Sequence, residues 1–513
     1  MSGRRAWLLI GLGALLLVLS YPPFRLPIVS FIAFTPAVLL IRQAVIDRDP
    51  RHAFRWGFWY GLISQGLVLY WLIVALWHFT PLSALGYLAT ILILALWHAV
   101  LFWYVVRVRL RLPRVPLWVV LPLGWTAVEW AVGHQGDIRF PWLGLGTSLA
   151  DAPLLIQWAD VAGARGVTLW VVWVNVMIAE AAMEWGRGKR ERGRVVAVVA
   201  SVLLVLGYGM WRMRTLPVRE VGVVALIQPN EGFREKWDPA RADSVVAKLL
   251  DMTRRVRALS RPDLVVWPEA AVPDFLFRRP GWDAAFAGLA REGHTPIVAG
   301  GAHVPQLPGG DYDYRHYYNA AFFYDSTGDR FRSPPYGKHY LVPIVERVPF
   351  VNPEWFGNLR WFGGFSSGTE LPIYRANLGR FGLIICYESI FPDLARRYRR
   401  TGAEFLVNIT NDKWYGATAG PYQHASHLVL RAIETRMGIA RAANSGISEF
   451  VDPLGRPYAA TRLETETVVA DRLRTSDVVP LYTRWGDWVG TLVVLATLGF
   501  AGGLAAQGWK RGA

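Results

Sequence analysis

Eight apolar segments, seven of them within the first 212 residues, limit how this chain can fold in water. A membrane-crossing helix needs about 20 predominantly apolar residues, because the hydrocarbon core of a bilayer is about 30 Å thick. Hydrophobic residues make up 53% of the chain and charged residues only 18%, which is too apolar for an ordinary soluble protein. We therefore predict membrane helices at residues 6–19, 27–41, 56–77, 85–106, 116–132, 167–183, 195–211 and 488–506.

The first of these segments has two interpretations, a secretory signal peptide or an uncleaved membrane helix. Signal peptides end at small residues, whereas Ser20, Tyr21, Pro22 and Pro23 follow this segment. We therefore favour the uncleaved helix.

The distribution of Lys and Arg predicts the orientation of these helices. Seventeen of these residues lie at the two termini and in three short loops, whereas the alternate loops hold only three. Cytoplasmic loops carry the excess of Lys and Arg, so both termini and the basic loops are predicted to be cytoplasmic. Topology then explains much of the net charge of +16, which weakens a nucleic-acid-binding interpretation. The basic loops are residues 42–55, 107–114 and 187–194, and the three exceptions are Arg25, Arg139 and Arg165.

After residue 218 the long apolar segments give way to short ones that are typical of strands. Short strands mixed with helices predict an α/β or α+β domain. We expect a membrane domain with seven transmembrane helices at residues 1–215, a catalytic domain at 216–485, and a final helix with a cytoplasmic tail at 486–513. The expected strands are residues 220–228, 263–267, 295–301, 319–324, 381–385 and 404–409, with a helix at 240–258.

Cys386 is the only cysteine of the chain, and it directly follows the predicted strand at residues 381–385. Reactive groups of α/β folds lie at the carboxyl ends of strands, and a lone cysteine near the carboxylate of Glu388 is a candidate nucleophile. The alternative is that Cys386 is a small buried hydrophobic residue. A single cysteine also excludes an intramolecular disulfide and a metal site built from cysteines.

Two other segments offer the groups that a nucleophilic cysteine needs. Glu269 follows the predicted strand at residues 263–267, and a carboxylate there can accept the thiol proton and later return it. Lys338 follows a turn, and its ammonium could stabilise both an oxyanion and a thiolate. Glu346 could orient Lys338 or relay protons. The alternative for Glu269 is a surface glutamate at a turn, and the alternative for Lys338 is an ordinary solvated lysine.

Together these segments match a known pattern: WPEAAVP at residues 267–273, GKHYLVP at 337–343 and ICYES at 385–389 resemble the Glu-Lys-Cys triad of the nitrilase superfamily. Nearly the whole chain resembles one branch, the bacterial apolipoprotein N-acyltransferases. That resemblance implies a multi-span α-helical membrane domain joined to an α/β nitrilase-like αββα sandwich domain. Further matching motifs lie at residues 140–142, 228–230, 236–239, 318–319, 411–416, 423–424 and 431–435.

The resemblance also implies roles for particular residues. Cys386 would be the nucleophile, Glu269 the general base and Lys338 the stabiliser of the oxyanion. Supporting or substrate-binding roles are implied for Glu346, Tyr387, Glu388, Trp237, Asn319 and Trp142.

One loop departs from the family pattern, which usually reads Pro-Phe-Gly-Glu-Phe-Val-Pro. Here residues 343–349 read PIVERVP, so the glutamate remains as Glu346 while a glycine becomes Val345 and an aromatic residue becomes Arg347. We expect the shape or mobility of this loop to differ from that of its relatives.

The resemblance implies an acyltransferase in lipoprotein biosynthesis. Such an enzyme transfers a fatty acyl chain from a membrane phospholipid to the α-amino group of the N-terminal diacylglyceryl-cysteine of apolipoproteins. It uses a cysteine thioester and no cofactor, in the last step of lipoprotein maturation. We expect a monomer in the bacterial inner membrane that crosses it several times, with a periplasmic catalytic domain and no nucleic-acid partner.

Two other classes of function use the same features differently. A membrane-tethered amidase or nitrile hydrolase would use the same triad but would leave the eight apolar segments unexplained. A transporter or membrane scaffold with an inactive domain would need the triad to arise by coincidence. A lysophospholipid product would distinguish acyl transfer from both.

Overall fold

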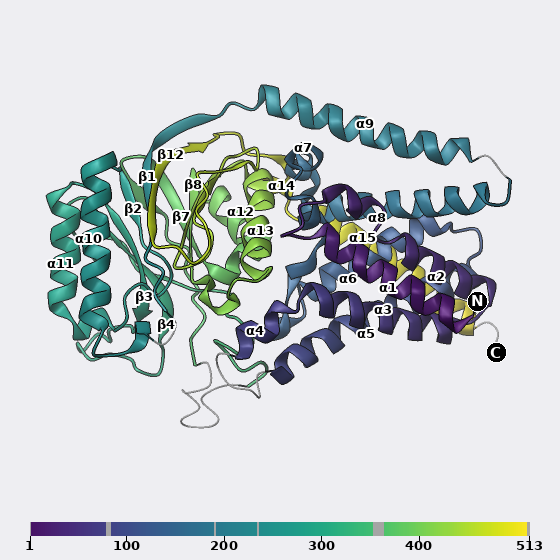
Figure 1. Ribbon diagram of the computed structural model, residues 1–513, viewed down its shortest axis with the longest axis horizontal. Helices are drawn as coiled ribbons and strands as arrows, with labels where there is room; N and C mark the ends of the chain where they lie inside the picture. Colours follow the sequence, from purple (N-terminus) through teal and green to yellow (C-terminus); the bar gives the residue numbers. More distant parts are fainter. Residues whose placement is uncertain (1, 78–83, 189–190, 233–234, 352–363, 510–513) are drawn as a thin grey trace. The chain divides into compact units, whose positions relative to one another are not determined.

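The computed structural model describes residues 2–77, 84–188, 191–232, 235–351 and 364–509 (Figure 1). The chain divides into two compact units, which are described separately. The first unit comprises Met1–Ile73, Thr80–Thr215 and Trp485–Ala513, and the second comprises Val74–Phe79 and Leu216–Arg484. Four of the basic residues used above to predict orientation, at positions 189, 190, 510 and 511, lie outside the described residues.

The first unit is helical, and all eight predicted apolar segments lie in helices. Six helices of the described chain are long and apolar enough to cross a membrane. Its elements are α1 (Gly3–Ser20), η1 (Pro27–Phe31), α2 (Thr35–Ile46), α3 (Pro50–Val68), the start of α4 (Trp71–Trp77), α5 (Ala84–Arg111), α6 (Leu117–Val132), η3 (Gly136–Ile138), η4 (Pro141–Leu143), η5 (Leu145–Leu149), α7 (Pro153–Ile156), α8 (Ala159–Trp185), α9 (Arg192–Thr215) and α15 (Trp488–Trp509). The rest of α4, from Val74 onward, belongs to the second unit.

Three predicted segments differ from simple straight helices. The segment at residues 27–41 consists of the 3-10 helix η1 and the first part of α2, with a turn at residues 32–34 between them. The segment at residues 56–77 consists of α3 and α4, which are bent by 62° relative to each other and together pass as a seventh candidate span. The segment at residues 116–132 is α6, whose 16 residues extend only about 24 Å at ~1.5 Å per residue. This helix is shorter than the usual length of a membrane span.

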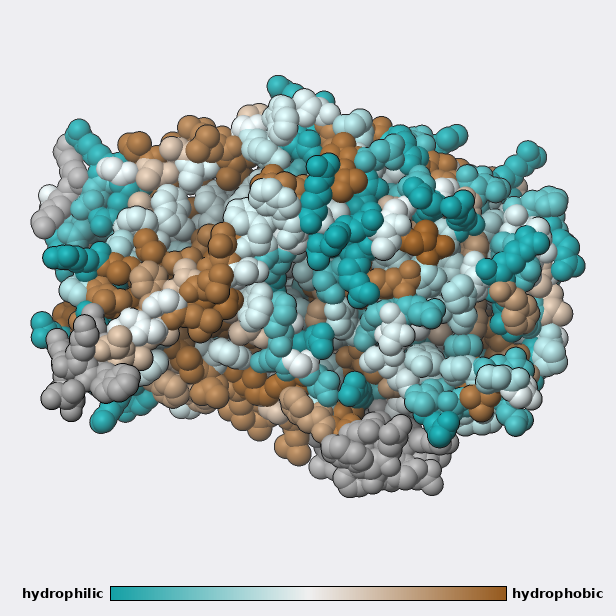
Figure 2. All heavy atoms as spheres, turned by 180° about the vertical axis from the view of Figure 1, so that it is seen from behind, coloured by the Kyte–Doolittle hydropathy of each residue, from teal (hydrophilic) through white to brown (hydrophobic). Residues whose placement is uncertain are grey.

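Large apolar side chains are exposed on the surface of the first unit (Figure 2). On α9, for example, Leu203 is 62% exposed and Leu204 75%, although both are aliphatic. Exposed apolar surface of this extent is typical of proteins that contact lipid or other proteins. The helices are therefore suited to a membrane by their surface as well as by their length.

The second unit contains two six-stranded sheets within the described residues. Each sheet has a parallel centre and antiparallel edges, and helices pack on its outer face. The first sheet has the order β12 (Thr467–Thr475), β1 (Arg219–Gln228), β2 (Leu264–Val266), β3 (Ile297–His303), β4 (Tyr318–Tyr324) and β5 (Tyr336–Gly337). The second has the order β11 (Pro457–Tyr458), β10 (Glu449–Val451), β9 (Gly438–Ala443), β8 (Phe405–Thr410), β7 (Gly379–Ile385) and β6 (Tyr374–Ala376).

Successive side chains of β1 point to opposite faces of the sheet, and each face packs against a different layer of the second unit. Val224 and Leu226 point into the core shared with the second sheet, whereas Ala225 and Ile227 pack in the core under helices α10 and α11. The second sheet is covered on its outer face by α12 and α13, so the order of layers is αββα. The helices are α10 (Ala242–Ser260), α11 (Pro280–Glu292), α12 (Pro392–Arg400) and α13 (Gly420–Thr435), followed by α14 (Leu481–Trp485).

All six predicted strands are present with ends shifted by a few residues, and the helix predicted at residues 240–258 is α10. The sequence interpretation did not identify the other six strands of the described residues, which are β5, β6, β9, β10, β11 and β12. β12 pairs antiparallel with β1 over its full length, so the first and last parts of this unit meet in one sheet.

A glycine in β3 allows the segment after β2 to pass close to the sheet. A Cβ atom on Gly300 would lie 2.3 Å from the backbone oxygen of Pro268 and 2.8 Å from the backbone nitrogen of Ala270. Contacts this short force the neighbouring atoms to move. Gly300 thus fixes the position of the segment that carries Glu269.

We expect Gly300→Ala to lower the free energy of unfolding of the second unit by about 1–3 kcal/mol, the usual cost of overpacking. The measurement is the thermal unfolding temperature in detergent solution. Gly288→Ala in α11 is the matched control, since nothing lies within 4 Å of its added Cβ and alanine favours helices. If Gly300→Ala unfolded at the parent temperature, the close approach would not be a constraint.

Candidate active site

Cys386 lies at the turn between β7 and the short 3-10 helix η10 (Cys386–Ile390). Its backbone is left-handed, with φ at 52°, a conformation that costs energy for residues other than glycine. The side chain is 5% exposed and is held at the carboxyl end of a central strand of the second sheet. Strained backbone conformations of this kind are frequent at active sites, where a reactive side chain must be held in one orientation.

Glu388 joins this turn to the segment that carries Lys338. Its carboxylate is fully buried and accepts hydrogen bonds from Ile385 N at 2.6 Å, His339 N at 2.6 Å and the Tyr336 hydroxyl at 2.8 Å. Burial raises the pKa of Glu388 to about 7, although these hydrogen bonds favour the charged form. Glu388 therefore holds the nucleophile turn and the lysine segment together.

Lys338 lies directly after β5, with its side chain 1% exposed. Its Nζ lies 2.9 Å from Glu346 Oε1 and 3.4 Å from Glu269 Oε1. Burial opposes the ammonium form, but Glu346 and Glu269 outweigh it and raise the pKa of Lys338 above its usual value. The lysine is thus a fixed positive charge that is itself buried from water.

Glu269 follows β2 and is nearly buried, at 5% exposed. Its Oε1 accepts a hydrogen bond from Asn319 Nδ2 at 2.7 Å, and its Oε2 accepts one from Asn411 N at 2.8 Å. Asn319 Nδ2 also donates to Glu346 Oε1 at 2.8 Å, so one amide group bridges the two carboxylates. This arrangement keeps both acids beside Lys338.

The electrostatic surroundings of Cys386 favour a neutral thiol at rest. Burial raises the pKa of the Cys386 thiol above its usual value, and Glu269 raises it further, whereas Lys338 lowers it. Such a thiol reacts only when a base removes its proton. Glu269 and Lys338 supply a base and a positive charge next to it.

The structure brings together six of the nine residues singled out by sequence: Cys386, Glu269, Lys338, Glu346, Asn319 and Glu388. Although the loop at residues 343–349 has an unusual sequence, its Glu346 still forms an ion pair with Lys338. Within this loop, Ile344 N donates to Arg347 O at 2.7 Å, and Val342 N donates to Glu346 Oε2 at 2.8 Å.

The remaining three candidates have different surroundings. Tyr387 is buried against Phe391, with ring centroids 5.2 Å apart, and Trp237 is 47% exposed. Trp142 belongs to the first unit, where it is 1% exposed and lies 4.6 Å from the Trp71 ring. Substrate-related roles for these three residues stay predictions.

The sequence interpretation missed Lys236 as a neighbour of Glu269. Its side chain is 2% exposed, and its Nζ donates to the backbone oxygen of Glu269 at 3.2 Å. Burial lowers the pKa of Lys236 to about 8, against the effect of Glu269 and Glu231. The KWDP motif that contains it matched the family, but a lysine in a short turn gives no sign of burial.

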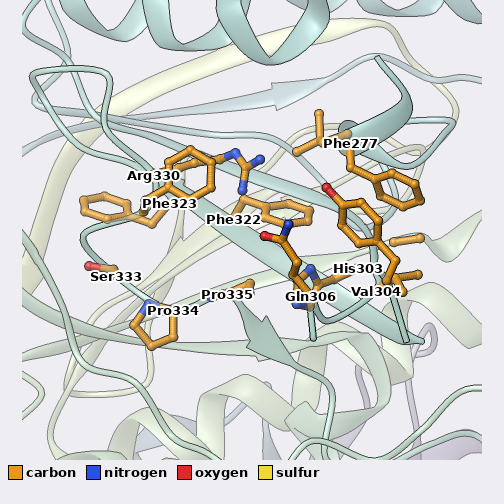
Figure 3. A pocket seen from close by; sticks show the side chains of 14 residues that line it. Phe277, His303, Val304, Gln306, Phe322, Phe323, Arg330, Ser333, Pro334 and Pro335 are labelled. Carbon is orange, nitrogen blue, oxygen red and sulfur yellow. The ribbon is translucent and has the colours of Figure 1, made fainter. Parts of the chain in front are cut away.

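A cavity of about 230 Å3 in the second unit is a separate feature (Figure 3). It is lined by aromatic side chains that include Phe277 and Phe322, and none of the candidate catalytic residues lines it. Its Arg330 is already paired with Asp283, with nitrogen–oxygen distances of 2.7 and 2.9 Å. This cavity is therefore separate from the cluster of Cys386, Glu269 and Lys338.

Comparison with known proteins agrees with the fold. Residues 223–481 match the carbon-nitrogen hydrolase family, which makes the second unit a nitrilase-type catalytic domain. Residues 13–177 match the family described as the apolipoprotein N-acyltransferase N-terminal domain. An amidase of known structure from Nesterenkonia sp. covers 53% of this chain and 95% of its own, with 18% identity and a TM-score of 0.36.

Full-length relatives extend the match to the whole chain. The apolipoprotein N-acyltransferase of Geobacter metallireducens is 33% identical over 97% of this chain and 96% of its own length. That of Chlorobaculum tepidum is 31% identical over 96% of this chain and 95% of its own. The chain belongs to the apolipoprotein N-acyltransferase family: it is a membrane-embedded acyltransferase of lipoprotein biosynthesis.

We expect Asn319→Leu to slow N-acylation of a lipopeptide about 10- to 100-fold while the fold persists. Leucine has a similar size but cannot donate to Glu269 and Glu346, and a hydrogen bond to a charged group is worth about 1.5–3 kcal/mol. Gln306→Leu is the control, since it loses only an exposed amide bond to Gly310 O. If Asn319→Leu acylated the lipopeptide at the parent rate, Asn319 would have no role in the site.

Proposed function

We propose that this chain transfers a fatty acyl chain from a membrane phospholipid to the α-amino group of the diacylglyceryl-cysteine that begins an apolipoprotein. The reaction proceeds through a thioester on Cys386. The observation that carries this proposal is the buried group formed by Cys386, Glu269 and Lys338, with Lys338 Nζ 3.4 Å from Glu269 Oε1. Family membership supports the lipoprotein acceptor.

In the first half of the reaction, Glu269 removes the proton from the Cys386 thiol. The sulfur attacks the carbonyl carbon of the acyl ester, and the ammonium of Lys338 stabilises the oxyanion that forms. The tetrahedral intermediate then expels the lysophospholipid alkoxide, which takes the proton back from Glu269. The product is an acyl thioester on Cys386.

In the second half, the α-amino group of the acceptor cysteine attacks the thioester. Glu269 takes the proton from the attacking amine, and the amide forms as the Cys386 thiolate leaves and is reprotonated. An ester donor already carries enough free energy for this sequence, so no cofactor is required. Burial of Cys386 and Lys338 disfavours water as a competing nucleophile.

Other residues have supporting roles in this scheme. Glu346 and Asn319 hold Lys338 and Glu269, and Glu388 positions the nucleophile turn. On the basis of the family resemblance, we assign Trp237 to a position near the substrate and Tyr387 to the support of the site. We assign Trp142 to a supporting or substrate-binding role. The aromatic rings suit acyl chains, because they bury large apolar surfaces.

We propose that residues 216–485 lie in the periplasm, between seven helices of residues 1–215 and the helix of residues 486–513. The excess of Lys and Arg in alternate loops supports this orientation in the inner membrane. It requires α6 to cross despite its 16 residues, either with help from flanking residues or where the bilayer is thinned. We further propose that the enzyme acts as a monomer.

We expect Cys386→Ser to abolish N-acylation without unfolding the protein, since an alkoxide forms far less readily than a thiolate with the same base. Lys338→Met should reduce formation of the acyl-enzyme about 100- to 1,000-fold, as loss of one oxyanion partner does in other enzymes. The measurement is lysophospholipid release from vesicles together with lipopeptide acylation. Normal acylation by Cys386→Ser would reject the nucleophile, and an amidase would release no lysophospholipid.

We expect a periplasm-active reporter enzyme to be active when fused after Gly368 and silent when fused after Gly188. Six predicted crossings precede Gly188 and seven precede Gly368, so the two positions are expected on opposite faces of the membrane. Protein levels of both fusions, measured with an antibody, provide the control. The opposite pattern would reject the orientation and the lipoprotein acceptor, while the thiol chemistry would remain possible.

A further inference from the structure

Lys236 is a buried lysine that the reaction scheme above does not use. It belongs to the short 3-10 helix η6 (Glu235–Trp237) and is 2% exposed. Within the described residues, its Nζ donates one hydrogen bond, at 3.2 Å to the backbone oxygen of Glu269, and lies 5.9 Å from the centre of the Trp237 ring. An ammonium is costly to bury without a close carboxylate, so this lysine should lower the stability of the fold.

The hydrogen bond from Lys236 fixes one peptide unit of the segment that carries the base. The accepting oxygen belongs to Glu269, and the next residue, Ala270, has a left-handed backbone with φ at 48°. That conformation is unfavourable for residues other than glycine. The same segment leaves no room for a Cβ atom on Gly300 of β3. Lys236 and Gly300 therefore both constrain the backbone at Glu269.

The ammonium of Lys236 also gives the site a second positive charge. Lys338 is shared by two carboxylates, because its Nζ lies 2.9 Å from Glu346 Oε1 and 3.4 Å from Glu269 Oε1. Two carboxylates beside one cation tend to keep a proton, since like charges at short range disfavour the ionisation of both. A protonated Glu269 could not accept the proton of the Cys386 thiol.

The charge of Lys236 depends on its burial and on two nearby carboxylates. Burial lowers the pKa of Lys236 to about 8, although Glu269 and Glu231 favour its ammonium form. The side chain is therefore mostly charged at neutral pH. Glu231 has another partner, since Lys248 Nζ lies 2.8 Å from its Oε1. Attraction between opposite charges is mutual, so the Lys236 ammonium favours the ionised carboxylate of Glu269.

We propose that Lys236 is a positioning residue for the base: its ammonium fixes the peptide oxygen of Glu269 and keeps the carboxylate of that residue ionised, ready to take the Cys386 proton. The proposal rests on the role of Glu269 as the base proposed above. It places a second buried cation on the backbone side of Glu269, whereas Lys338 lies beside the carboxylate.

This role differs from that of a lysine which stabilises the fold. Methionine has a similar length and no charge, so Lys236→Met removes the cost of burying an ammonium. Its neighbours keep other partners, because Glu231 retains Lys248 and the Glu269 carboxylate retains the Asn319 amide at 2.7 Å. We therefore expect this variant to unfold in detergent solution at the parent temperature or above it, while its base works less well.

Alkylation by iodoacetamide in the full-length protein measures the effect on the base. Cys386 is the only cysteine, so the intact mass reports this thiol alone. The neutral thiol reacts only after a base removes its proton, so the rate depends on Glu269. Lys236→Met should alkylate about 10- to 100-fold more slowly than the parent at neutral pH, the usual effect of losing a hydrogen bond from a charged group.

Lys248→Met is the matched control. It removes a lysine that pairs with Glu231 and Glu466, and no printed contact of Lys248 reaches Glu269. We expect this variant to alkylate at close to the parent rate and to unfold at the parent temperature or below it, because an ion pair is lost. The two lysine variants should thus separate activity from stability in opposite directions.

A double variant shows whether Lys236 acts through Glu269. Glu269→Gln removes the base, and alkylation then no longer depends on the ionisation of that residue. Adding Lys236→Met to Glu269→Gln should therefore cause no further slowing, whereas two independent effects would add.

The role of Lys236 would be overturned by a parent alkylation rate for Lys236→Met, by failure of this variant to fold, or by additive losses in the double variant. These readouts use no substrate, so they do not depend on acyl transfer. If all variants behave as expected but the parent forms no acyl-enzyme from phospholipid vesicles, the proposed function fails and the positioning role of Lys236 stands.

Discussion

The buried ammonium of Lys338 is the charge around which the catalytic unit is arranged. An isolated ammonium would be expensive to bury, and Glu346 at 2.9 Å and Glu269 at 3.4 Å offset that cost. The two carboxylates would repel each other without the lysine and the bridging amide of Asn319. Removal of any member therefore takes away a contact that holds the others in place.

The two sheets contribute different parts of this arrangement. Glu269, Asn319 and Lys338 come from the ends of strands in the first sheet, and Cys386 comes from the end of β7 in the second. The Glu388 carboxylate connects the two sheets, because it accepts hydrogen bonds from Ile385 N in the second sheet and from His339 N, which follows the first. The packing of one sheet on the other thus sets the distance between base and nucleophile.

The two strands that precede Cys386 and Glu269 were predictable, because their apolar runs end abruptly at polar residues. Cys386 after residues 381–385 and Glu269 after residues 263–267 are of this kind, and the carboxyl ends of such strands meet at one edge. The bend between α3 and α4 was not predictable, because the apolar pattern of residues 56–77 continues through it. The hydrogen bond between His424 and the backbone carbonyl of Cys386 was equally unpredictable, since it joins residues far apart in sequence through tertiary packing.

The central claim is that Cys386 carries the acyl chain between donor and acceptor. Intact-mass analysis of the purified protein, incubated with a phospholipid of one defined acyl chain and no lipopeptide, tests it most directly. The account predicts a mass increase of one acyl group, mapped to Cys386 and lost when lipopeptide is added, with an equal amount of lysophospholipid released. Rapid N-acylation of lipopeptide by a protein that never carries this mass, or carries it on another residue, would contradict the account.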